Sequence, residues 1–276
     1  MKYLVTGHLG YIGGNIYRKL QEEGHEVVGI DKKNGWEILD TIDKIDGSFD
    51  GVFHLAAEPS VQFSVEHPTV TMKRNVLVSS KVLEWSKNNG VKKVVFSSSA
   101  AVLGTGDGPT SPYGLHKKIT EQECKLYSKL YNLDTVSLRY FNVFSADQPF
   151  GGAYSTAICA WKHLIGLSKP LRIDGDGTQT RDFIHVDDIV SANLFVMNHE
   201  NEFKGSIFEV GTGKSISLNT IKQVIDQNYE IDWNFALERV GDIKHSCSNP
   251  APLRKLGWSN TVEPIEAIQK IFTKKR

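Results

Sequence analysis

A tyrosine and a lysine four residues apart, Tyr113 and Lys117, form the pair in this chain best suited to proton transfer. They fall at the start of a stretch, residues 114–131, whose pattern predicts a helix, so both side chains share one helix face. A free tyrosine has a pKa of about 10, which is too high for a good base at neutral pH. A neighbouring ammonium favours the phenolate, so we expect Lys117 to lower the pKa of Tyr113.

A glycine-rich turn near the N-terminus predicts a dinucleotide site. Gly7, Gly10 and Gly13 follow the apolar run of residues 3–5, and residues 11–23 carry apolar side chains at helical spacing. Glycines at such a junction permit a tight turn, bring the backbone close to a pyrophosphate and let helix and strand pack tightly. The amides at the start of the helix then point at the phosphates.

Asp31 indicates which dinucleotide this turn would hold. It follows the next strand-like run, residues 26–30, and lies 18 residues beyond Gly13. A carboxylate at this point accepts hydrogen bonds from a ribose diol and repels an added 2′-phosphate. Asp31 therefore favours NAD over NADP, although the adjacent Lys32 and Lys33 weaken the discrimination.

The first half of the chain alternates strand-like and helix-like segments that position these residues. Besides those already named, strands are predicted at 52–55, 94–97 and 135–138, with a helix at 70–89. Such alternation with β-branched strands predicts a parallel sheet covered on both faces. Right-handed crossovers make it doubly wound, which is the Rossmann arrangement.

Beyond residue 144 the pattern loosens, and Gly and Pro become frequent. Helices are predicted at 154–166, 187–198, 217–229 and 261–273, with short strands near 171–173 and 206–210. We therefore predict an α/β protein with a Rossmann NAD-binding domain over residues 1–144. A smaller mixed α/β substrate-binding region is predicted over 145–276, with part of 180–210 packing back on the first domain.

Composition excludes several classes of protein. Lys plus Arg and Asp plus Glu each total 32 in 276 residues, so there is no electrostatic reason to expect a nucleic-acid partner. The three cysteines are sparse and odd in number, which argues against a disulfide framework and suits a reducing compartment. No signal peptide or membrane-spanning run is expected, and no motif predicts a metal site. We expect a cytoplasmic protein with no membrane partner.

Further segments carry a family resemblance. Besides Gly7-x-x-Gly10-x-x-Gly13 and the Tyr113/Lys117 pair, the matching segments in order are 54–57, 75–76, 96–104, 139–143, 175–188, 211–213, 241–242 and 256–258. Together they resemble the extended short-chain dehydrogenase/reductase family, and within it the NAD-dependent nucleotide-sugar epimerase/dehydratase branch (UDP-glucose 4-epimerase-like). The resemblance covers nearly the whole chain.

The resemblance implies roles for individual residues. Tyr113 would accept a proton from a sugar hydroxyl, Lys117 would hold the nicotinamide ribose and tune Tyr113, and Ser99 would hydrogen-bond the same hydroxyl. The implied cofactor-binding residues are Gly7, Gly10, Tyr11, Ile12, Gly13, Asp31, Leu55, Ala56, Ala57, Asn75, Ser97, Tyr113, Lys117 and Tyr140. The implied substrate-binding residues are Ser99, Asn142, Arg181, Arg239, Asp242 and Ser246. The two arginines suit a diphosphate because a guanidinium can bind phosphate through two hydrogen bonds.

The residues after Ser99 bear on the reaction. Sugar-dehydratase relatives carry a carboxyl pair there, whereas this chain has Ala100 and Ala101. What remains is oxidation of a UDP-hexose or UDP-N-acetylhexosamine at C4 and re-reduction from the other face, which is epimerisation with bound NAD regenerated each turnover. Two alternatives stay open: a net NAD(P)-dependent oxidoreductase on a nucleotide sugar, and a non-catalytic NAD-binding relative.

The resemblance also bears on specificity, assembly and chain length. A small residue at Ser246 hints at a pocket that admits an N-acetyl group. Relatives form a homodimer through helices that correspond to 70–89 and 114–131, and the apolar residues expected on that face are Val76, Val82, Leu83, Leu126 and Leu130. Only 22 residues separate Asp31 from His54, so one strand is expected to be missing and the sheet to have six strands.

Overall fold

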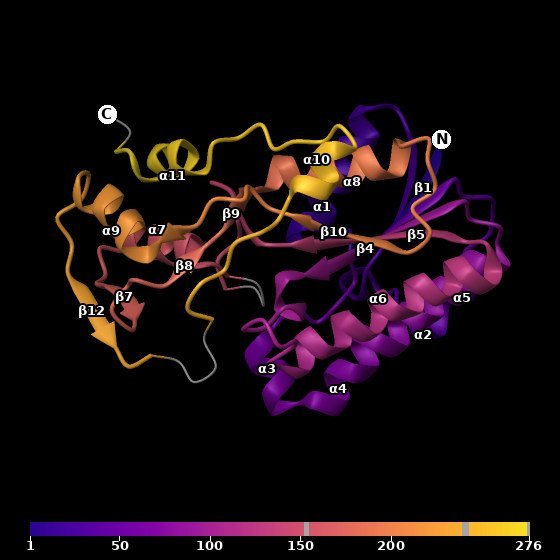
Figure 1. The fold of residues 1–276 in the computed structure, drawn as a ribbon, viewed down its shortest axis with the longest axis horizontal. Coiled ribbons are helices and arrows are strands. Elements are labelled where there is room, and N and C mark those ends of the chain that lie inside the picture. The colour runs from indigo at the N-terminus through magenta and orange to yellow at the C-terminus, as the bar shows by residue number, and fades with distance from the viewer. Residues whose placement is uncertain (152–154, 239–242, 275–276) are drawn as a thin grey trace. The chain divides into compact units, whose positions relative to one another are not determined.

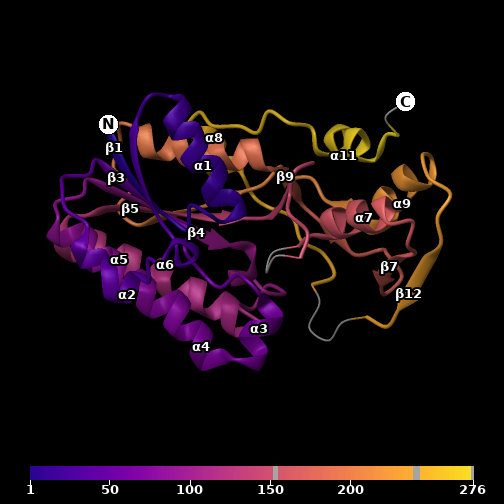
Figure 2. The ribbon, with the colours of Figure 1, turned by 180° about the vertical axis from the view of Figure 1, so that it is seen from behind.

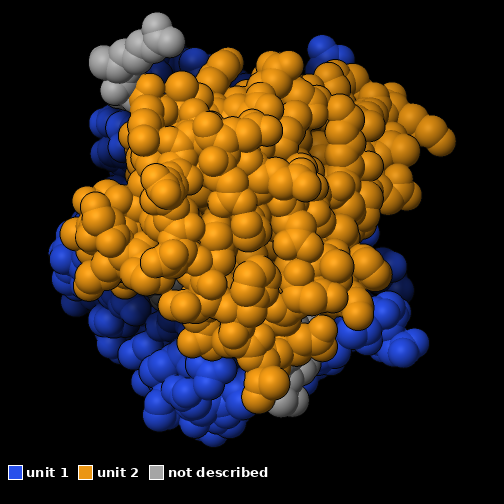
Figure 3. Space-filling model, turned by 90° about the vertical axis from the view of Figure 1, so that its left-hand side faces the viewer, with its two compact units in different colours: residues 1–140, 189–209 blue, residues 141–188, 210–276 orange. Residues whose placement is uncertain are grey.

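The computed structural model describes residues 1–151, 155–238 and 243–274, and the chain divides into two compact units. Unit 1 comprises Met1–Tyr140 and Ile189–Glu209, and unit 2 comprises Phe141–Asp188 and Val210–Arg276 (Figure 3). The chain thus leaves unit 1 after its first 140 residues and returns to it once.

Unit 1 is built on a six-stranded sheet in the order β10-β5-β4-β3-β1-β2. Its strands are β1 (Lys2–Thr6), β2 (Glu26–Ile30), β3 (Gly51–His54), β4 (Lys93–Ser99), β5 (Asp134–Tyr140) and β10 (Ser206–Val210). The pairs β1–β2, β1–β3, β3–β4 and β4–β5 are all parallel. The strand order reverses at β1, which is where ligands bind in sheets of this kind. The predicted doubly wound sheet of six strands is confirmed.

Helices cover both faces of this sheet. In Figures 1 and 2, α1 and α8 lie on one side of the sheet and α2 to α6 lie on the other. The helices are α1 (Tyr11–Glu22), α2 (Ile38–Thr41), α3 (Val61–Glu66), α4 (Pro68–Met72), α5 (Val78–Asn88), α6 (Pro112–Tyr131) and α8 (Val186–Asn198). Shorter turns are η1 (Lys32–Asn34), η2 (Ile42–Lys44), the π-helical η3 (Lys73–Leu77) and η4 (Ala100–Val102). The helix predicted over 70–89 is therefore interrupted by a π-helical turn.

The ends of α6 follow from its sequence. Ser111 caps the helix by accepting a hydrogen bond from the Gly114 amide at 3.2 Å. Pro112 occupies the first helical turn, where its missing N–H costs nothing. Asn132 ends the helix in the left-handed conformation with φ of 56°. The Ser111 cap and Pro112 therefore place Tyr113 in the first turn of α6.

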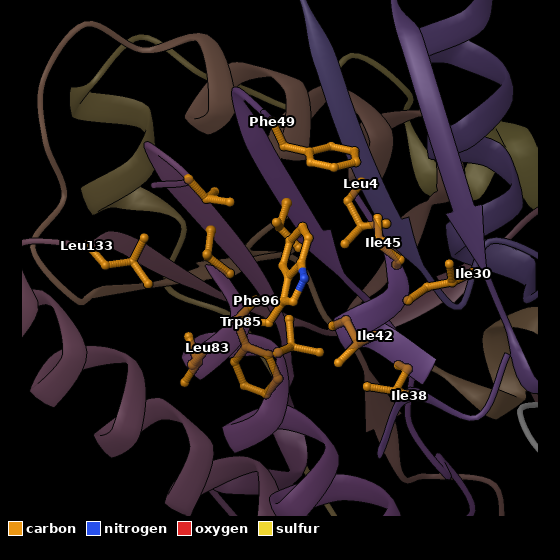
Figure 4. Close-up of a cluster of buried hydrophobic side chains, with 14 of the residues drawn as sticks. Leu4, Ile30, Ile38, Ile42, Ile45, Phe49, Leu83, Trp85, Phe96 and Leu133 are labelled. Atoms are coloured by element: carbon orange, nitrogen blue, oxygen red, sulfur yellow. The ribbon is translucent and has the colours of Figure 1, made fainter. Parts of the chain in front are cut away.

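A cluster of buried hydrophobic side chains packs between the sheet and the helices on one face (Figure 4). Phe96 of β4 and Trp85 of α5 belong to it. Ile38, Ile42 and Ile45 add three buried side chains at helical spacing. One strand was expected to be missing from the short connection between Asp31 and His54. The helical spacing of the three isoleucines explains why this connection forms the turns α2 and η2 instead.

The described residues of unit 2 form three two-stranded sheets and a core of their own. The strands are β6 (Asn142–Phe144), β7 (Leu171–Asp174), β8 (Thr180–Arg181), β9 (Phe183–His185), β11 (Ile216–Ser217) and β12 (Trp233–Ala236). They pair as β6–β9 and β7–β12, both parallel, and β8–β11, antiparallel. The helices are α7 (Ala157–Gly166), α9 (Leu218–Asp226), α10 (Ala251–Lys255) and α11 (Pro264–Phe272). Phe144, Trp161, Ile221 and Phe272 belong to the buried cluster of this unit.

A buried histidine ties β1 and β3 to α5. The His54 ring contacts the Thr6 hydroxyl at 2.7 Å through Nδ1 and the Ser79 hydroxyl at 2.8 Å through Nε2. Burial lowers the pKa of His54 to about 3, and the nearby Lys117 ammonium acts in the same direction. The folded chain therefore holds this imidazole neutral across the physiological range of pH.

The pKa of His54 predicts acid sensitivity. An unfolded histidine titrates near 6.5, so the unfolded state binds more protons than the folded state between pH 6.5 and about 3. Stability from this group is full above pH 6.5 and is lost as pH falls toward 3. Between pH 7.5 and pH 5 we expect His54 to account for a loss of about 2 kcal/mol in the free energy of unfolding. Urea unfolding followed by tryptophan fluorescence at the two pH values measures this loss.

A variant pair isolates the contribution. His54→Gln should lower stability at pH 7.5 and remove this part of the pH dependence, whereas His67→Gln, at an exposed position on the same unit, should keep it. Equal losses in His54→Gln and the wild type would contradict the assignment.

Candidate functional site

The glycine-rich turn lies at the point where the strand order of the sheet reverses. Gly7 follows β1 with φ of +75°, and a Cβ there would lie 2.8 Å from the amide nitrogen of Ala56 in the loop after β3. A Cβ on Gly13 would lie 2.2 Å from the carbonyl oxygen of Gly7. Gly10 begins α1, whose first turn carries no acidic side chain. These contacts require glycine and leave backbone amides to face an anion.

Two polar side chains, Thr6 and Asn75, hold the loop after β3 through hydrogen bonds to its backbone. The Thr6 hydroxyl accepts hydrogen bonds from the amides of Leu55 and Ala56, at 3.2 and 3.1 Å. Asn75, on the π-helical turn η3, accepts from the Glu58 amide at 2.7 Å and donates to the Glu58 carbonyl at 3.0 Å. The amide group of Asn75 is thus engaged with the backbone of this loop.

Asp31 is tied to the glycine turn. Its carboxylate accepts from the Leu9 amide at 3.2 Å and from the Lys33 amide at 2.9 Å, each on a different oxygen. The second bond caps η1. A carboxylate oxygen has room for more than one donor, so both oxygens keep acceptor capacity for a diol.

The three predicted catalytic residues come together in unit 1. Ser99 ends β4, and Tyr113 and Lys117 lie one turn apart on α6. The Lys117 Nζ donates to the Ser97 carbonyl oxygen at 2.6 Å and lies 5.9 Å from the centre of the Tyr113 ring. The Ser99 hydroxyl accepts from the Ala101 amide at 3.2 Å and is hydrogen-bonded to Tyr113.

The pKa of Tyr113 differs from the expectation. Burial raises the pKa of Tyr113 to about 12, and the Ser99 hydrogen bond only partly opposes this, although Tyr113 as a residue keeps part of its surface exposed. The expectation that Lys117 lowers the pKa below its usual value is therefore wrong for the chain alone, because removing a phenolate from water costs more than the neighbouring groups return. Burial also lowers the pKa of Lys117 to about 8, with Glu121 and Cys124 acting in the opposite direction.

Tyr140 stands beside this group at the end of β5. It pairs in register with Ser99 of β4. Its hydroxyl donates to the Asn193 side chain of α8 at 2.9 Å. Burial raises the pKa of Tyr140, so it is a neutral hydrogen-bonding group.

Three of the predicted substrate-binding residues lie in described parts of unit 2. Asn142 begins β6, and Arg181 ends β8 and donates to the Thr180 carbonyl at 2.9 Å. The Ser246 amide donates to the same carbonyl at 3.1 Å, so Arg181 and Ser246 share the Thr180 carbonyl oxygen as a hydrogen-bond acceptor. Arg239 and Asp242 lie outside the described residues.

Asp182 organises this part of unit 2, and the sequence analysis did not single it out. It is fully buried and its carboxylate accepts from the amides of Thr212, Gly213 and Ser248 and from two hydroxyls. Its backbone carbonyl accepts from the Asn142 amide at 2.9 Å. Its position directly after Arg181 in a matching segment was the available signal. Thr6, Glu58 and Asn193 were missed as well, because their partners are distant in sequence.

Two further observations concern metal ions and membranes. Across the described ranges, no three His, Cys, Asp or Glu side chains gather closely enough to hold a metal ion. None of the helices among those residues combines the length and the hydrophobicity that crossing a membrane requires.

Curated relatives match the chain over almost its full length. A putative UDP-glucose 4-epimerase from Methanocaldococcus jannaschii is 34% identical, with 97% of this chain and 96% of that protein covered. A UDP-glucose 4-epimerase from Mycolicibacterium smegmatis is 32% identical, with 98% and 97% covered.

Solved structures agree with these relatives. A UDP-N-acetylglucosamine 4-epimerase from Methanobrevibacter ruminantium M1, in complex with UDP-N-acetylmuramic acid, has a TM-score of 0.91 at 32% identity, with 98% of this chain and 96% of that chain covered. A UDP-glucuronic acid 4-epimerase from Bacillus cereus, in complex with UDP-glucuronic acid and NAD, has a TM-score of 0.87 at 26% identity, with 99% and 98% covered.

The family model described as NAD dependent epimerase/dehydratase family matches residues 3–211. The match includes the glycine turn, Asp31 and the Ser99, Tyr113 and Lys117 group. The chain belongs to the NAD-dependent epimerase/dehydratase family.

Proposed function

We propose that this chain is an NAD-dependent epimerase that inverts C4 of a UDP-linked hexose or N-acetylhexosamine. The observation that carries the proposal is the meeting of Ser99, Tyr113 and Lys117 at the same edge of the sheet as the glycine turn. Ala100 and Ala101 follow Ser99, so the η4 turn offers no carboxyl pair to eliminate water. The similar proteins are named as UDP-sugar 4-epimerases.

The residues of unit 1 fit NAD. The close approach of Gly7 to Ala56 and of Gly13 to Gly7 leaves a backbone surface that only glycine permits. The proposed holding residues are the glycine turn with Tyr11 and Ile12, then Asp31, Leu55 to Ala57, Asn75, Ser97, Tyr113, Lys117 and Tyr140. Bound NAD supplies a hydride acceptor that returns the hydride within the same turnover.

The protein groups move the proton. Tyr113 takes the proton of the C4 hydroxyl as the hydride leaves, and Ser99 holds the same hydroxyl. With a pKa of about 12, Tyr113 is almost entirely protonated at neutral pH in the chain alone. With NAD bound, Lys117 would hold the nicotinamide ribose, and the positive charges of Lys117 and of the oxidised ring would favour the phenolate and lower the pKa of Tyr113.

Residues of unit 2 are proposed to bind the nucleotide sugar. Asn142 and Arg181 suit the diphosphate, because an amide and a guanidinium both donate to phosphate oxygens. Arg239 and Asp242 are proposed from the sequence alone. Residues 1–144 are proposed as the cofactor-binding domain and 145–276 as the substrate-binding region, with part of 180–210 packing back on the first domain, which is supported by the membership of Ile189–Glu209 in unit 1.

The first prediction concerns turnover itself. Purified protein should carry NAD and interconvert UDP-glucose and UDP-galactose, or their N-acetyl forms, without added cofactor. Tyr113→Phe should lower kcat by about 10² to 10⁴, the range expected for loss of a proton acceptor, while retaining NAD. Separation of the sugar nucleotides by chromatography measures the interconversion by the wild type and the loss of kcat in Tyr113→Phe.

The matched control is Tyr131→Phe, an exposed tyrosine at the end of the same helix, which should retain full activity. A stoichiometric change in absorbance with added NAD(P)H would indicate a net oxidoreductase instead. Absence of any epimer from this panel, or full activity in Tyr113→Phe, would contradict the proposal.

Specificity is predicted to depend on Ser246. Ser246→Tyr should lower kcat/KM for UDP-N-acetylglucosamine by roughly tenfold or more and leave UDP-glucose nearly unchanged, because a bulky ring would exclude the N-acetyl group. Initial rates on the two substrates measure the ratio. Equal effects on both would show that Ser246 does not select the substituent.

A homodimer through the helices of residues 70–89 and 114–131, that is α4, α5 and α6, is also proposed. These helices expose several large hydrophobic side chains, among them Leu126 at 50% and Leu130 at 57%. Two of the side chains expected on this face do not belong to it: Val82 and Leu83 are 0% and 1% exposed because they pack in the core of unit 1.

The cysteines concern the location of the protein. They are few and form no disulfide, which supports a reducing compartment, and we propose the cytoplasm.

Substitution tests the dimer. Leu126→Glu combined with Leu130→Glu should convert the protein to a monomer in sedimentation at micromolar concentration, because two charges would be buried in an apolar contact. Leu237→Glu, at a leucine 91% exposed in unit 2, should leave the oligomeric state unchanged. A wild-type protein that sediments only as a monomer would reject the dimer.

A further inference from the structure

Glu121 is a fully buried carboxylate that lies one turn beyond Lys117 on α6. It accepts from the Ser98 hydroxyl at 2.6 Å through Oε1. Arg139 of β5 donates to both of its oxygens, from Nε and Nη2, each at 2.8 Å. The arginine also lies 4.0 Å from Glu209 of β10. The carboxylate thus joins α6 to β4 and β5, and Arg139 extends the contact to β10.

The contacts follow a regular pattern along α6 and β4. Tyr113, Lys117 and Glu121 occupy successive turns of one helix face, and each is joined to one of three consecutive serines. Tyr113 is hydrogen-bonded to Ser99 and Lys117 to the Ser97 carbonyl. Glu121 takes the hydroxyl between them, that of Ser98. A shift of the helix along the strand by one residue would break all three contacts.

We infer that Glu121 is a positioning residue whose carboxylate, one helical turn beyond Lys117 and bonded to Ser98, supports the ammonium and holds it in register with Ser97 and Ser99. The inference rests on the proposed function, because it assigns a purpose to the Lys117 ammonium.

The charges around Lys117 identify Glu121 as the source of the effect. On α6, Tyr113, Glu121 and Cys124 are the ionisable neighbours, and β3 contributes His54, which is neutral. Strand β4 offers only the Ser97 carbonyl and the Phe96 ring, whose centre lies 4.8 Å from Nζ. Burial lowers the pKa of Lys117 to about 8, and of the groups that oppose this Glu121 is the largest.

Stability alone does not account for the buried ion pair between Glu121 and Arg139. A buried pair is often no more stabilising than hydrophobic side chains of the same volume, because both charges lose their hydration. A carboxylate beside the ammonium does have a chemical consequence, since without it Lys117 would lose its proton at a lower pH.

Glu121→Gln tests the charge. The variant keeps the side-chain shape but removes the anion, so the pKa of Lys117 should fall by about one unit. Titration of the holoenzyme by NMR with ¹⁵N-labelled lysine measures this without any sugar substrate, and Lys117→Met assigns the signal. The alkaline limb of the pH–rate profile should move to lower pH by a similar amount. Glu123→Gln is the matched control, because Glu123 also accepts from a serine on α5 but is not among the groups acting on Lys117.

Ser98→Ala tests the register separately and removes only one hydroxyl. It should lower kcat severalfold with KM, bound NAD and the pKa of Lys117 unchanged. If Glu121→Gln fails to fold, the Ser98→Ala result decides the inference: an unchanged kcat overturns it. An unchanged or raised pKa of Lys117 in folded Glu121→Gln also overturns it. Failure of every UDP-sugar to react would refute the proposed function and leave the NMR result standing.

Discussion

The hydrogen bond from the buried Lys117 ammonium to the Ser97 carbonyl is the interaction on which the rest of this site depends. An ammonium out of water needs close acceptors, and the Ser97 carbonyl oxygen accepts from it at 2.6 Å. The bond fixes the helix that carries Tyr113 to the strand that carries Ser99. With a pKa of about 8, Lys117 is mostly charged at neutral pH, so a positive charge lies 5.9 Å from the Tyr113 ring even though burial desolvates the phenol.

The backbone must permit this approach of α6 to β4. A Cβ on Gly114 would lie 2.4 Å from the Ala101 carbonyl oxygen, so the first turn of α6 is pressed against η4. The same kind of constraint acts at the other end of the site, where Gly7 and the loop after β3 exclude a Cβ. Both glycines serve close contact, and the side-chain chemistry is supplied by residues one turn or one strand away.

Much of the architecture follows from local patterns in the sequence. The apolar runs of the sheet strands and the helical spacing around Ile16 and Leu20 are local signals, and they specify a doubly wound sheet. The sequence also brought together Ser99, Tyr113 and Lys117, through a spacing and a family resemblance. It did not reveal the direction of the pKa shift of Tyr113, because desolvation depends on the burial created by the whole unit.

Residues that act through distant partners escaped prediction for the same reason. Asp182 meets Ser248 66 positions away, and Tyr140 meets Asn193 53 positions away. A lone Asp or Asn has no local pattern that identifies such a partner. The interruption of the helix over 70–89 by η3 is similar, since the π-helical turn carries Asn75, whose side chain is engaged with the Glu58 backbone.

The short connection after β2 holds Asp31, which is proposed to bind the cofactor, through local hydrogen bonds. Asp31 is buried and is held at both oxygens by backbone amides, one from the glycine turn and one from η1. Lys33 closes the same contact from the other side by donating to the Leu9 carbonyl at 3.1 Å. The Lys33 ammonium is thus hydrogen-bonded to the glycine turn. Of the two lysines that weaken the discrimination against NADP, Lys33 therefore already has a partner within the chain. Local hydrogen bonds therefore hold the Asp31 carboxylate against the glycine turn, where, in the proposed cofactor site, it would repel a 2′-phosphate.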